Sequence, residues 1–561
     1  MMCRNILSLR RPIPLLVLVA LLTLLAGQAL ATKEGGTSRQ QFLEGIKILG
    51  AVYERVYYNY VDDVDPYELL ESGITGMMEY LDEHSQYLPP VHYDDLMMST
   101  EGEFGGLGIT INIRDHYPTV VSPIEGTPAF LMGVQGGDKI IEIEGDTTRD
   151  FTSNEAVKLL RGEPGTAVNI TIEREGFEKP IPLTIVRDII KVESVPYAFM
   201  IDDIGYVRIQ NFARTTAEEL SIAIDDLKAA GARGILLDLR WNPGGLLDAA
   251  CAVSEMFLDQ GDLIVYTKGR LRNQNRSYYS EDHGAPGTET LPLIVMINGA
   301  SASASEIVSA AVQDHDRGLV VGKTSFGKGS VQTVFPLTED RALKLTTAKY
   351  YTPSGRSIHK DRHRDDSIDL TETAPTDPAD EVELDSEPKE QFQTDGGRII
   401  YGGGGITPDI EIEQPFLGDF EVAIERDYSL FQFATKWAAH HEVPRDLVPD
   451  DALIAEFHDF LATREKLPEY LEVYELELTS ELLAEEHDYI AKGLRRELMR
   501  LKFGQEAAYR VAIEDDVQLQ EALDLFRRVS TTADLIKLAD EWASERVAAD
   551  TESEAETATV H

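Results

Sequence analysis

A strand, a turn of small residues and a helix, followed by a glycine-rich segment, constrain this chain more than any other feature. An apolar run over 291–297 ends in an Asn-Gly-Ala turn, and SASAS then leads into an amphipathic pattern over 304–313. Such a segment presents a serine hydroxyl at a helix N-terminus, where backbone N–H groups stabilise a negatively charged oxygen. We therefore expect a serine-based site at this turn.

One lysine stands in the glycine-rich segment SFGKGSVQ. Lys328 lies between Gly327 and Gly329, with no acidic residue beside it in the sequence. A lysine that acts as a general base must be largely neutral, and burial away from carboxylates lowers its pKa. If the segment continues as a strand, Lys328, Ser330 and Gln332 share one face, because side chains alternate with a period of two. The pattern favours a serine nucleophile with a lysine base.

Simpler interpretations exist for both segments. Ser303 and Glu306 fit a capping box, which would only close the helix N-terminus. The FGKG sequence alone fits an exposed turn with a solvated lysine. Chemistry by itself accepts Ser301, Ser303 or Ser305 as the nucleophile.

Together, the two segments resemble the C-terminal processing (tail-specific) serine proteases. The resemblance rests on SASASE followed by FGKGSVQ, with Lys328 standing 25 positions after Ser303. It implies that Ser303 is the nucleophile, that Lys328 is the general base, and that Gln332 orients the lysine.

A second turn, DLRWNPGG at 238–245, resembles the DLRxNPGG turn of the same family. In that family a glycine amide of this turn and the amide after the nucleophile form the oxyanion hole. The resemblance therefore implies Gly245 and Ala304 as donors, with Gly244 as the alternative to Gly245. A plain turn between a strand and a helix is the simpler interpretation.

Short strand patterns and Gly/Pro turns occupy 101–188, and the opening FGGLGITI resembles the carboxylate-binding loop of a PDZ domain. Backbone N–H groups converge on a peptide's terminal carboxylate in such a loop. The resemblance implies Gly106, Leu107 and Gly108 as donors, and a peptide strand added beside Ile109. Arg161 would contact the peptide or couple the domain to the core, unless it is a solvated helix-end arginine. For GGLG alone, a glycine turn is the alternative.

Composition narrows the function classes. The chain has 561 residues and a formal net charge of −46, which disfavours nucleic acid as a partner. Arg4, Arg10 and Arg11 precede an apolar run that ends in Ala-Leu-Ala at 29–31, which predicts an export signal. An uncleaved membrane anchor over 13–31 is the alternative. Without the signal only Cys251 remains, so we expect no internal disulfide and no cysteine cluster for a metal site. The acyl-enzyme mechanism that the family resemblance implies uses no metal or organic cofactor.

The fold class we predict is α/β and multidomain. A crotonase-like α/β protease core, as the resemblance implies, would carry a helical N-terminal region, an inserted α+β PDZ domain and a helical C-terminal extension. The expected boundaries are 1–31 for the signal, 38–98 for the helical region, 101–188 for the PDZ domain, 189–413 for the core with an acidic loop at 361–390, 421–547 for the helical extension, and 548–561 for a disordered acidic tail.

The predicted function is an exported serine endopeptidase of the periplasm or cell envelope. It would bind protein or peptide substrates through free, apolar C-termini and cleave near the tail through an acyl-enzyme. Association with the membrane through the N-terminus, and a homo-oligomer built on the first helix, are further hypotheses. Two alternatives stay open: an inactive PDZ-bearing binding module, and a Ser-His-Asp hydrolase that uses His315, expected in an exposed turn between Asp314 and Asp316.

Overall fold

The computed structural model describes residues 39–281, 291–360 and 390–542. The predicted export signal, nearly all of the acidic loop and the acidic tail lie outside these ranges. The chain divides into two compact units, one formed by the residues up to Pro89 with Val334–Leu345, the other by Pro90–Thr333 with the residues from Thr346 onward. Each unit is described by itself.

The first unit is mainly helical. Residues 39–59 form a helix, and α2 spans Pro66–Glu79. The carboxylate of Asp65 caps α2 by accepting the N–H groups of Tyr67 and Glu68. The region expected to be helical also contains strand β1, Gln86–Leu88, which pairs antiparallel with the start of strand β18. The sequence predicted helix here and missed this strand, because three extended residues are stabilised by pairing with β18 and not by a local pattern.

The helix over 39–59 exposes its apolar side chains. Phe42, Ile46, Leu49 and Val52 recur at helical spacing, and all are at least 52% exposed. From the sequence, this helix could either pack into a core or mediate dimerisation. Within this single chain, its apolar side chains are not part of a core.

The second unit is built on a six-stranded sheet with strand order β10-β11-β12-β15-β16-β21. Strand β10 is antiparallel to β11, and the other neighbours are parallel. The four central strands are mostly apolar, apart from Arg208 and Asp238 at the ends of β11 and β12, as expected for a sheet with both faces covered by helices. The bounds are β10 Tyr197–Ile201, β11 Ile204–Arg208, β12 Ile235–Asp238, β15 Leu293–Ile297, β16 Leu319–Gly322 and β21 Ile410–Glu411.

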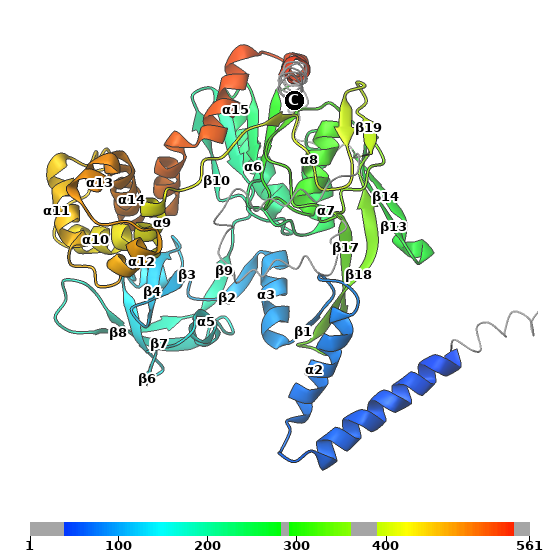
Figure 1. Cartoon of the computed structure of the whole chain (residues 1–561), viewed down its shortest axis with the longest axis horizontal. Coiled ribbons are helices and arrows are strands. Elements are labelled where there is room, and N and C mark those ends of the chain that lie inside the picture. Colours follow the sequence, from blue (N-terminus) through cyan, green and yellow to red (C-terminus); the bar gives the residue numbers. More distant parts are fainter. Residues whose placement is uncertain (1–38, 282–290, 361–389, 543–561) are drawn as a thin grey trace, which may run out of the picture. The chain divides into compact units, whose positions relative to one another are not determined.

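Alternate side chains of this sheet enter two different cores. Figure 1 draws the strands and the helices that contribute to these cores. Val207, Leu237 and Val295 pack against the helices α6 (Thr216–Ala229), α7 (Leu247–Glu255) and α8 (Ala304–Asp314). Tyr206, Leu236 and Ile294 pack against α15 (Val517–Arg528) and residues 535–539. The C-terminal extension therefore covers one face of the core sheet. The sequence had left the role of this extension undecided.

An antiparallel sheet lies beside the core, with strand order β1-β18-β13-β14 and with β17 paired to β18. Strand β17 begins two residues after Lys328. The bounds are β13 Leu263–Gly269, β14 Arg276–Tyr279, β17 Ser330–Pro336 and β18 Ala342–Tyr351; β19 Gln391–Gln393 and β20 Ile399–Tyr401 form a separate hairpin.

Residues 109–186 form the sheet β3-β4-β5-β7-β8, in which β3 is an edge strand. Helix α5, which spans Ser153–Leu160, lies against β3 and begins with a capping box between Thr152 and Glu155. The remaining bounds are α3 Pro90–Glu101, β2 Glu103–Gly106, β3 Ile109–Arg114, β4 Tyr117–Pro123, α4 Pro128–Leu131, β5 Lys139–Ile143, β6 Asp146–Thr147, β7 Ala167–Glu173, β8 Ile181–Val186 and β9 Asp188–Lys191.

The C-terminal extension has a helical core of its own. Its longest helix, α14 (His487–Ala512), is broken at Gly504, where φ is 85° and ψ is −176°. The other bounds are α9 Asp419–Arg426, α10 Ser429–Ala438, α11 Asp451–Leu461, α12 Leu467–Val473 and α13 Ser480–Glu485. No helix within the described ranges is long and apolar enough to cross a membrane.

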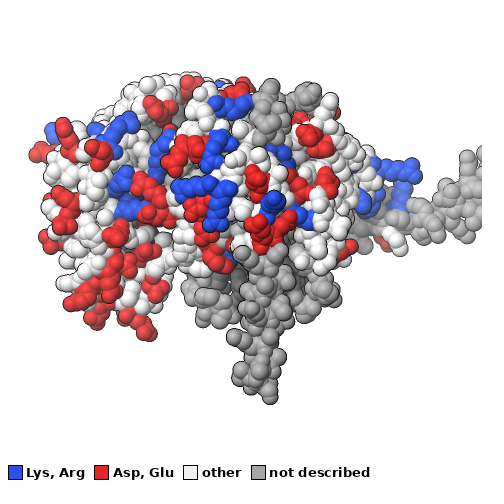
Figure 2. Space-filling view, turned by 90° about the horizontal axis from the view of Figure 1, so that it is seen from above, with Lys and Arg blue, Asp and Glu red and all other residues white. Residues whose placement is uncertain are grey.

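Figure 2 shows mainly acidic side chains at the lower left of this face and a mixture of acidic and basic side chains over its middle. Basic side chains there lie between acidic ones and form no continuous basic surface.

Candidate active site

Ser303 stands at the N-terminus of α8 in a strained backbone conformation. Its φ is 54° and its ψ is −110°, a region that side chains with a Cβ rarely adopt. Such strain costs about 1–3 kcal/mol and is kept only where the surroundings impose it. The surroundings here are the buried strand β15 on one side and a fully buried helix on the other.

The three serines of SASAS differ in what their hydroxyls do. The Ser301 hydroxyl donates to the carbonyl of Leu239 at 2.9 Å, and the Ser305 hydroxyl donates to the carbonyl of Asn242 at 2.9 Å. Both serines are fully buried, whereas Ser303 is only half-buried. Two of the hydroxyls therefore tie the SASAS turn to the DLRWNPGG turn, and only Ser303 is open to a substrate.

One buried carboxylate, that of Glu306, connects the serine turn to the lysine segment. Its Oε2 accepts the backbone N–H of Ser303 at 2.7 Å and that of Lys328 at 3.0 Å. The two backbone nitrogens therefore lie within about 6 Å of each other, the limit that these two distances set. Residues 25 positions apart in the sequence are thus held by a single oxygen atom.

The other oxygen of Glu306 binds the same segment. Its Oε1 accepts the Ser325 hydroxyl at 2.6 Å and the Gly327 N–H at 2.7 Å. The Ser325 oxygen accepts the N–H of Ile406, so its proton points to Glu306. Burial raises the pKa of Glu306 and these hydrogen bonds oppose the rise. Because every partner is a donor, the carboxylate is ionised. Glu306 thus forms the capping box that the sequence indicated. The same carboxylate also binds residues 325–328.

Tyr350, which sequence reasoning missed, lies between the two segments. Its hydroxyl donates to the carbonyl oxygen of Lys328, and its N–H donates to the carbonyl of Gly329 at 3.0 Å. Burial raises the pKa of Tyr350 well above its usual value, the charge of Glu306 adds to this, and a hydrogen bond with the Ser303 hydroxyl opposes it. The tyrosine is therefore neutral and touches both Ser303 and Lys328. No sequence motif marks it; only its place on β18 does.

Lys328 and Gln332 are placed differently from each other. Lys328 is half-buried and precedes β17, so it does not share the strand face that we predicted for it. Gln332 lies on β17 and donates to the Ser330 hydroxyl at 2.9 Å and the Thr346 hydroxyl at 3.4 Å. Gln332 and Ser330 thus share a face, as the alternation predicted, whereas the glycines beside Lys328 delay the start of the strand.

The DLRWNPGG turn packs directly on the serine turn. A Cβ added to Gly244 would lie 2.7 Å from the Ser303 Cβ and 2.9 Å from the Ala304 nitrogen, so only glycine fits. The Gly244 N–H is occupied by the Asn242 side chain at 2.9 Å. Among the described residues, the N–H groups of Gly245 and Ala304 have no hydrogen-bond acceptor. The geometry therefore favours Gly245 over Gly244 as the partner of Ala304.

Arg240 of the same turn anchors it to the C-terminal extension. The buried guanidinium binds Asp238 at 2.8 Å, Asp516 at 2.7 Å and the Gln518 side chain at 3.0 Å. The turn is thereby held from its outer side by residues more than 270 positions away, a link that the sequence did not indicate.

His315 lies at the other end of α8 from Ser303. The helix has 11 residues, which corresponds to about 16 Å at 1.5 Å per residue. The ring is held by Asp395 at 2.7 Å and by the Leu263 carbonyl at 2.8 Å, and its side chain is only 11% exposed. The alternative with His315 as the base is therefore wrong, and so is its expected exposure, because a rigid helix separates the two residues.

Neither a thiol nor a metal cluster competes with the serine within the described residues. Cys251 is buried in α7, and burial raises the pKa of its thiol to about 12. No group of three or more His, Cys, Asp or Glu side chains with metal-binding geometry occurs in the ranges that the structure describes.

The loop predicted to bind a peptide carboxylate presents backbone N–H groups. Gly106 ends β2, and Leu107 and Gly108 connect it to Ile109 at the start of β3. Leu107 and Gly108 are buried, yet their N–H groups have no acceptor in the described part of the chain. Buried N–H groups are nearly always paired, so this loop is suited to an external anion.

Arg161 caps the C-terminus of α5, and its side chain lies beside Gly106, 3.9 Å from a Cβ added there, and reaches α3. It binds Asp95 at 2.9 Å and lies 4.9 Å from the centre of the Phe104 ring. Arg161 therefore joins the domain to the preceding helix α3, and the two roles that the sequence left open for it, peptide contact and coupling to the catalytic core, stay predictions.

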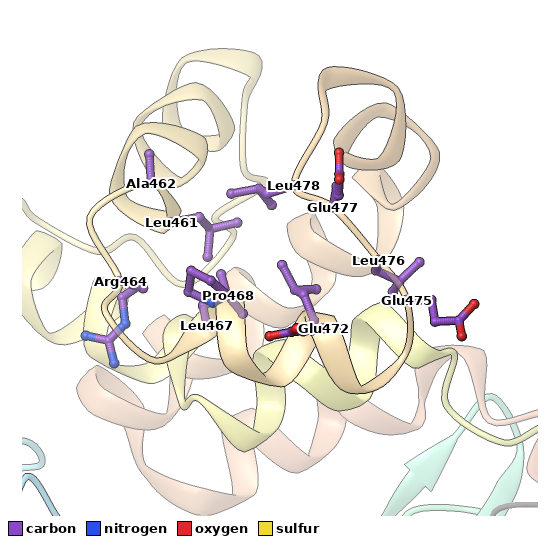
Figure 3. Close-up of a pocket in the computed structure, with 11 residues that line it drawn as sticks. Leu461, Ala462, Arg464, Leu467, Pro468, Glu472, Glu475, Leu476, Glu477 and Leu478 are labelled. Atoms are coloured by element: carbon purple, nitrogen blue, oxygen red, sulfur yellow. The ribbon is translucent and has the colours of Figure 1, made fainter.

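The C-terminal extension also contains a cavity of about 790 Å³ (Figure 3). Leucines such as Leu467 and Leu478 line it, and Glu472, Glu475 and Glu477 stand along it. None of the candidate catalytic or tail-binding residues is part of its lining.

Comparisons with known proteins identify the families that this chain resembles. Residues 203–368 match the model of peptidase family S41, and residues 105–185 match that of the PDZ domain. The carboxy-terminal-processing protease of Bartonella bacilliformis is 48% identical over 313 residues, which are 55% of this chain and 71% of that protein. The carboxy-terminal processing protease CtpA of Bacillus subtilis is 36% identical over 56% of this chain and 66% of its own length.

Two solved structures overlap parts of the chain. The photosystem II D1 C-terminal processing protease is 28% identical over 54% of this chain and 83% of its own, with a TM-score of 0.32. The peptide-bound PDZ domain of the Vibrio cholerae carboxy-terminal protease is 30% identical over 16% of this chain and 99% of its own, with a TM-score of 0.15. By its sequence relatives, the chain belongs to peptidase family S41, as a serine-type peptidase of the carboxy-terminal processing group that carries a PDZ domain.

Proposed function

We propose that this protein is an exported endopeptidase that captures the free C-terminus of a substrate protein at its PDZ domain and cleaves near that tail with Ser303 and Lys328. The observation that carries this proposal is the Glu306 oxygen that binds the backbone N–H groups of both residues. A structural serine and a solvated lysine would not need a shared buried carboxylate.

The proposed reaction proceeds through an acyl-enzyme. The neutral Lys328 amine takes the proton of the Ser303 hydroxyl as the oxygen attacks the carbonyl carbon of the substrate. The resulting ammonium then gives that proton to the leaving amine, and water releases the acyl group by the same sequence of steps. Gln332, which binds Ser330 on the strand that follows Lys328, would steady the lysine segment.

The oxyanion would be held by the N–H groups of Gly245 and Ala304. Neither group has an acceptor among the described residues, and the glycine turn leaves room for the substrate oxygen. Each such donor contributes about 3–4 kcal/mol to stabilisation of the transition state in other hydrolases.

Substrate capture would use the loop 106–108 and the open edge of β3. The unpaired N–H groups of Leu107 and Gly108 would hold the terminal carboxylate, and the peptide would continue as a strand along β3 from Ile109. Apolar terminal side chains suit the site, because the adjoining core of this sheet is apolar.

The proposal also covers the location of the protein and the fold of its core. The arginines, apolar run and Ala-Leu-Ala sequence of residues 1–31 support export to the periplasm or cell envelope, with cleavage of the signal favoured over membrane anchoring. The parallel sheet β11-β12-β15-β16-β21, with helices on both faces, supports a crotonase-like core.

The proposal is tested by cleavage of a folded exported protein that carries an apolar C-terminal tail. We expect Ser303→Ala and Lys328→Ala to abolish cleavage, while the exposed-residue controls Ser480→Ala and Lys179→Ala retain it. A substrate whose C-terminus is amidated should be cleaved more slowly, because the carboxylate loop loses its ligand. Full activity of Lys328→Ala would refute the Ser/Lys mechanism, and tail binding without cleavage would leave the binding-module alternative.

A further inference from the structure

A peptide bound at β3 would have a defined register. With its carboxylate at Leu107 and Gly108, an antiparallel peptide strand places its last residue opposite Ile109. Each earlier residue then lies opposite the next residue of β3, so the third residue before the last lies opposite Asn112. Directly paired residues on antiparallel strands send their side chains to the same face.

Asn112 is in contact with a segment from the other end of the chain. Its side-chain amide donates to the hydroxyl of Tyr428 at 3.2 Å, across a separation of 316 residues. Tyr428 precedes α10 of the C-terminal extension and is 38% exposed. An aromatic ring from a different domain therefore stands beside the upstream part of the peptide path.

Arg114, the last residue of β3, fixes this ring in place. Its guanidinium carbon lies 4.6 Å from the centre of the Tyr428 ring and 3.5 Å from that of Phe431. Arg114 is only 8% exposed, and burial lowers its pKa to about 10, so it stays cationic at neutral pH. A cation over an aromatic face is attractive, and more so when it is desolvated.

The contact extends along the neighbouring strand and is close. The Gln505 side chain donates to the Ser122 hydroxyl at 3.0 Å, and a Cβ added to Gly137 would lie 2.5 Å from the Thr435 side chain. The C-terminal extension is thus in contact with β3 and β4, and α5 also lies against β3.

The backbone of Tyr428 is strained. Its φ of 54° and ψ of 27° are left-handed, a conformation that favours Gly or Asn over a bulky residue. A tyrosine at such a position costs stability, and strain of this kind gathers at functional sites. The contacts with Asn112 and Arg114 use its hydroxyl and the ring face under the guanidinium, and Tyr428 remains 38% exposed.

We infer that Tyr428 and Asn112 form an upstream subsite of the tail-binding groove, which takes an aromatic side chain three residues before the C-terminal residue of the substrate. Stacked aromatic rings attract each other beyond their burial, and the Asn112 amide adds a hydrogen-bonding group at the same place. The inference rests on the proposed binding of C-terminal tails by this domain. It makes the C-terminal extension part of substrate selection.

The test measures tail binding by the full-length chain with Ser303→Ala, which prevents cleavage. Fluorescent peptides with one apolar C-terminal sequence carry Phe or Ala three residues before the end, or Phe six residues before the end. We expect the first Phe peptide to bind about 3- to 10-fold more tightly than the Ala peptide. Phe at the more distant position should give no gain.

Tyr428→Asn should remove this preference and leave the affinity for the Ala peptide within about twofold, because Asn accepts the left-handed backbone. Asn112→Ala should reduce the preference, and Phe177→Ala, which removes an exposed aromatic elsewhere in the same domain, should leave it unchanged. A Phe preference that persists in Tyr428→Asn, or an equal loss for both peptides, would overturn the subsite while tail binding stands. If the chain binds no tail at all, or binds amidated tails equally well, the proposed function fails with it.

Discussion

The two candidate sites of this protein differ in how their backbone segments are held. Around Ser303 and Lys328, buried hydrogen bonds to Glu306 hold the serine turn and the lysine segment together within the core. Beside β3, the N–H groups of Leu107 and Gly108 have no acceptor among the described residues and the strand edge is open, and the Tyr428 side chain of the C-terminal extension contacts Asn112 near the far end. Both sites leave N–H groups without an acceptor among the described residues, and the comparison teaches that they differ in what holds those groups: a buried carboxylate joins the neighbouring segments only at the candidate catalytic site.

Replacing Glu306 by Gln should have the largest effect. The amide would place an N–H₂ group against N–H donors, and about 1–3 kcal/mol is lost for each donor left unpaired. We expect a loss of about 2–4 kcal/mol in the free energy of unfolding and at least a 100-fold fall in kcat, measured by denaturant titration and peptide cleavage. Wild-type kcat in this variant would show that Glu306 does not hold the two segments together.

Removing the hydroxyl of Tyr350 should reduce catalysis without disturbing binding. In Tyr350→Phe, the Lys328 carbonyl and the Ser303 hydroxyl lose their shared partner, while the buried ring still fills its place. We expect kcat to fall about 10-fold, as for the loss of about 1.4 kcal/mol, with KM unchanged and the pH dependence of kcat shifted. A change confined to thermal stability would assign Tyr350 a purely structural role.

Gly108→Ala should affect recognition only. The added Cβ would lie 2.3–2.5 Å from the Thr127 side chain and close the carboxylate loop. Gly126→Ala is a matched control, since Gly126 has a φ of 77° against 76° for Gly108 but nothing within 4 Å. We expect tail affinity to fall about 10-fold or more in the first variant only, with cleavage of short peptides that bypass the loop retained in both. Equal effects of the two changes would point to backbone strain alone.

The smallest effect concerns His315. Burial lowers its pKa, but the hydrogen bonds to the Leu263 carbonyl and to Asp395 outweigh this and raise it above 6.5. Its stabilising contribution is therefore complete below that pH and is lost as the pH rises through the raised value. His315→Gln should lower the unfolding midpoint more at pH 5.5 than at pH 8.5, and peptide cleavage should persist. A uniform shift at both pH values would contradict the raised pKa.

Sequence motifs located the parts of both sites, yet they left their assembly open. Each motif is a local turn that can be recognised from neighbouring residues alone: SASAS, FGKG, DLRWNPGG and GGLG. The sequence could not show which serine is accessible to a substrate. The answer depends on hydrogen bonds to the carbonyls of Leu239 and Asn242, which lie some 60 residues earlier. The placement of Lys328 before β17, rather than on it, likewise follows from contacts that no strand pattern contains.

The sequence by itself determined the family, the strand–turn–helix units and the residue types of the chemistry, because these depend on neighbours along the chain. Tertiary structure alone decided that Glu306 and Tyr350 join the serine to the lysine and that His315 is remote from both. It also decided that the C-terminal extension covers the core sheet and reaches Asn112. The physical reason is that hydrogen bonds and packing act over a few ångströms, and only the folded chain brings residues hundreds of positions apart to that distance.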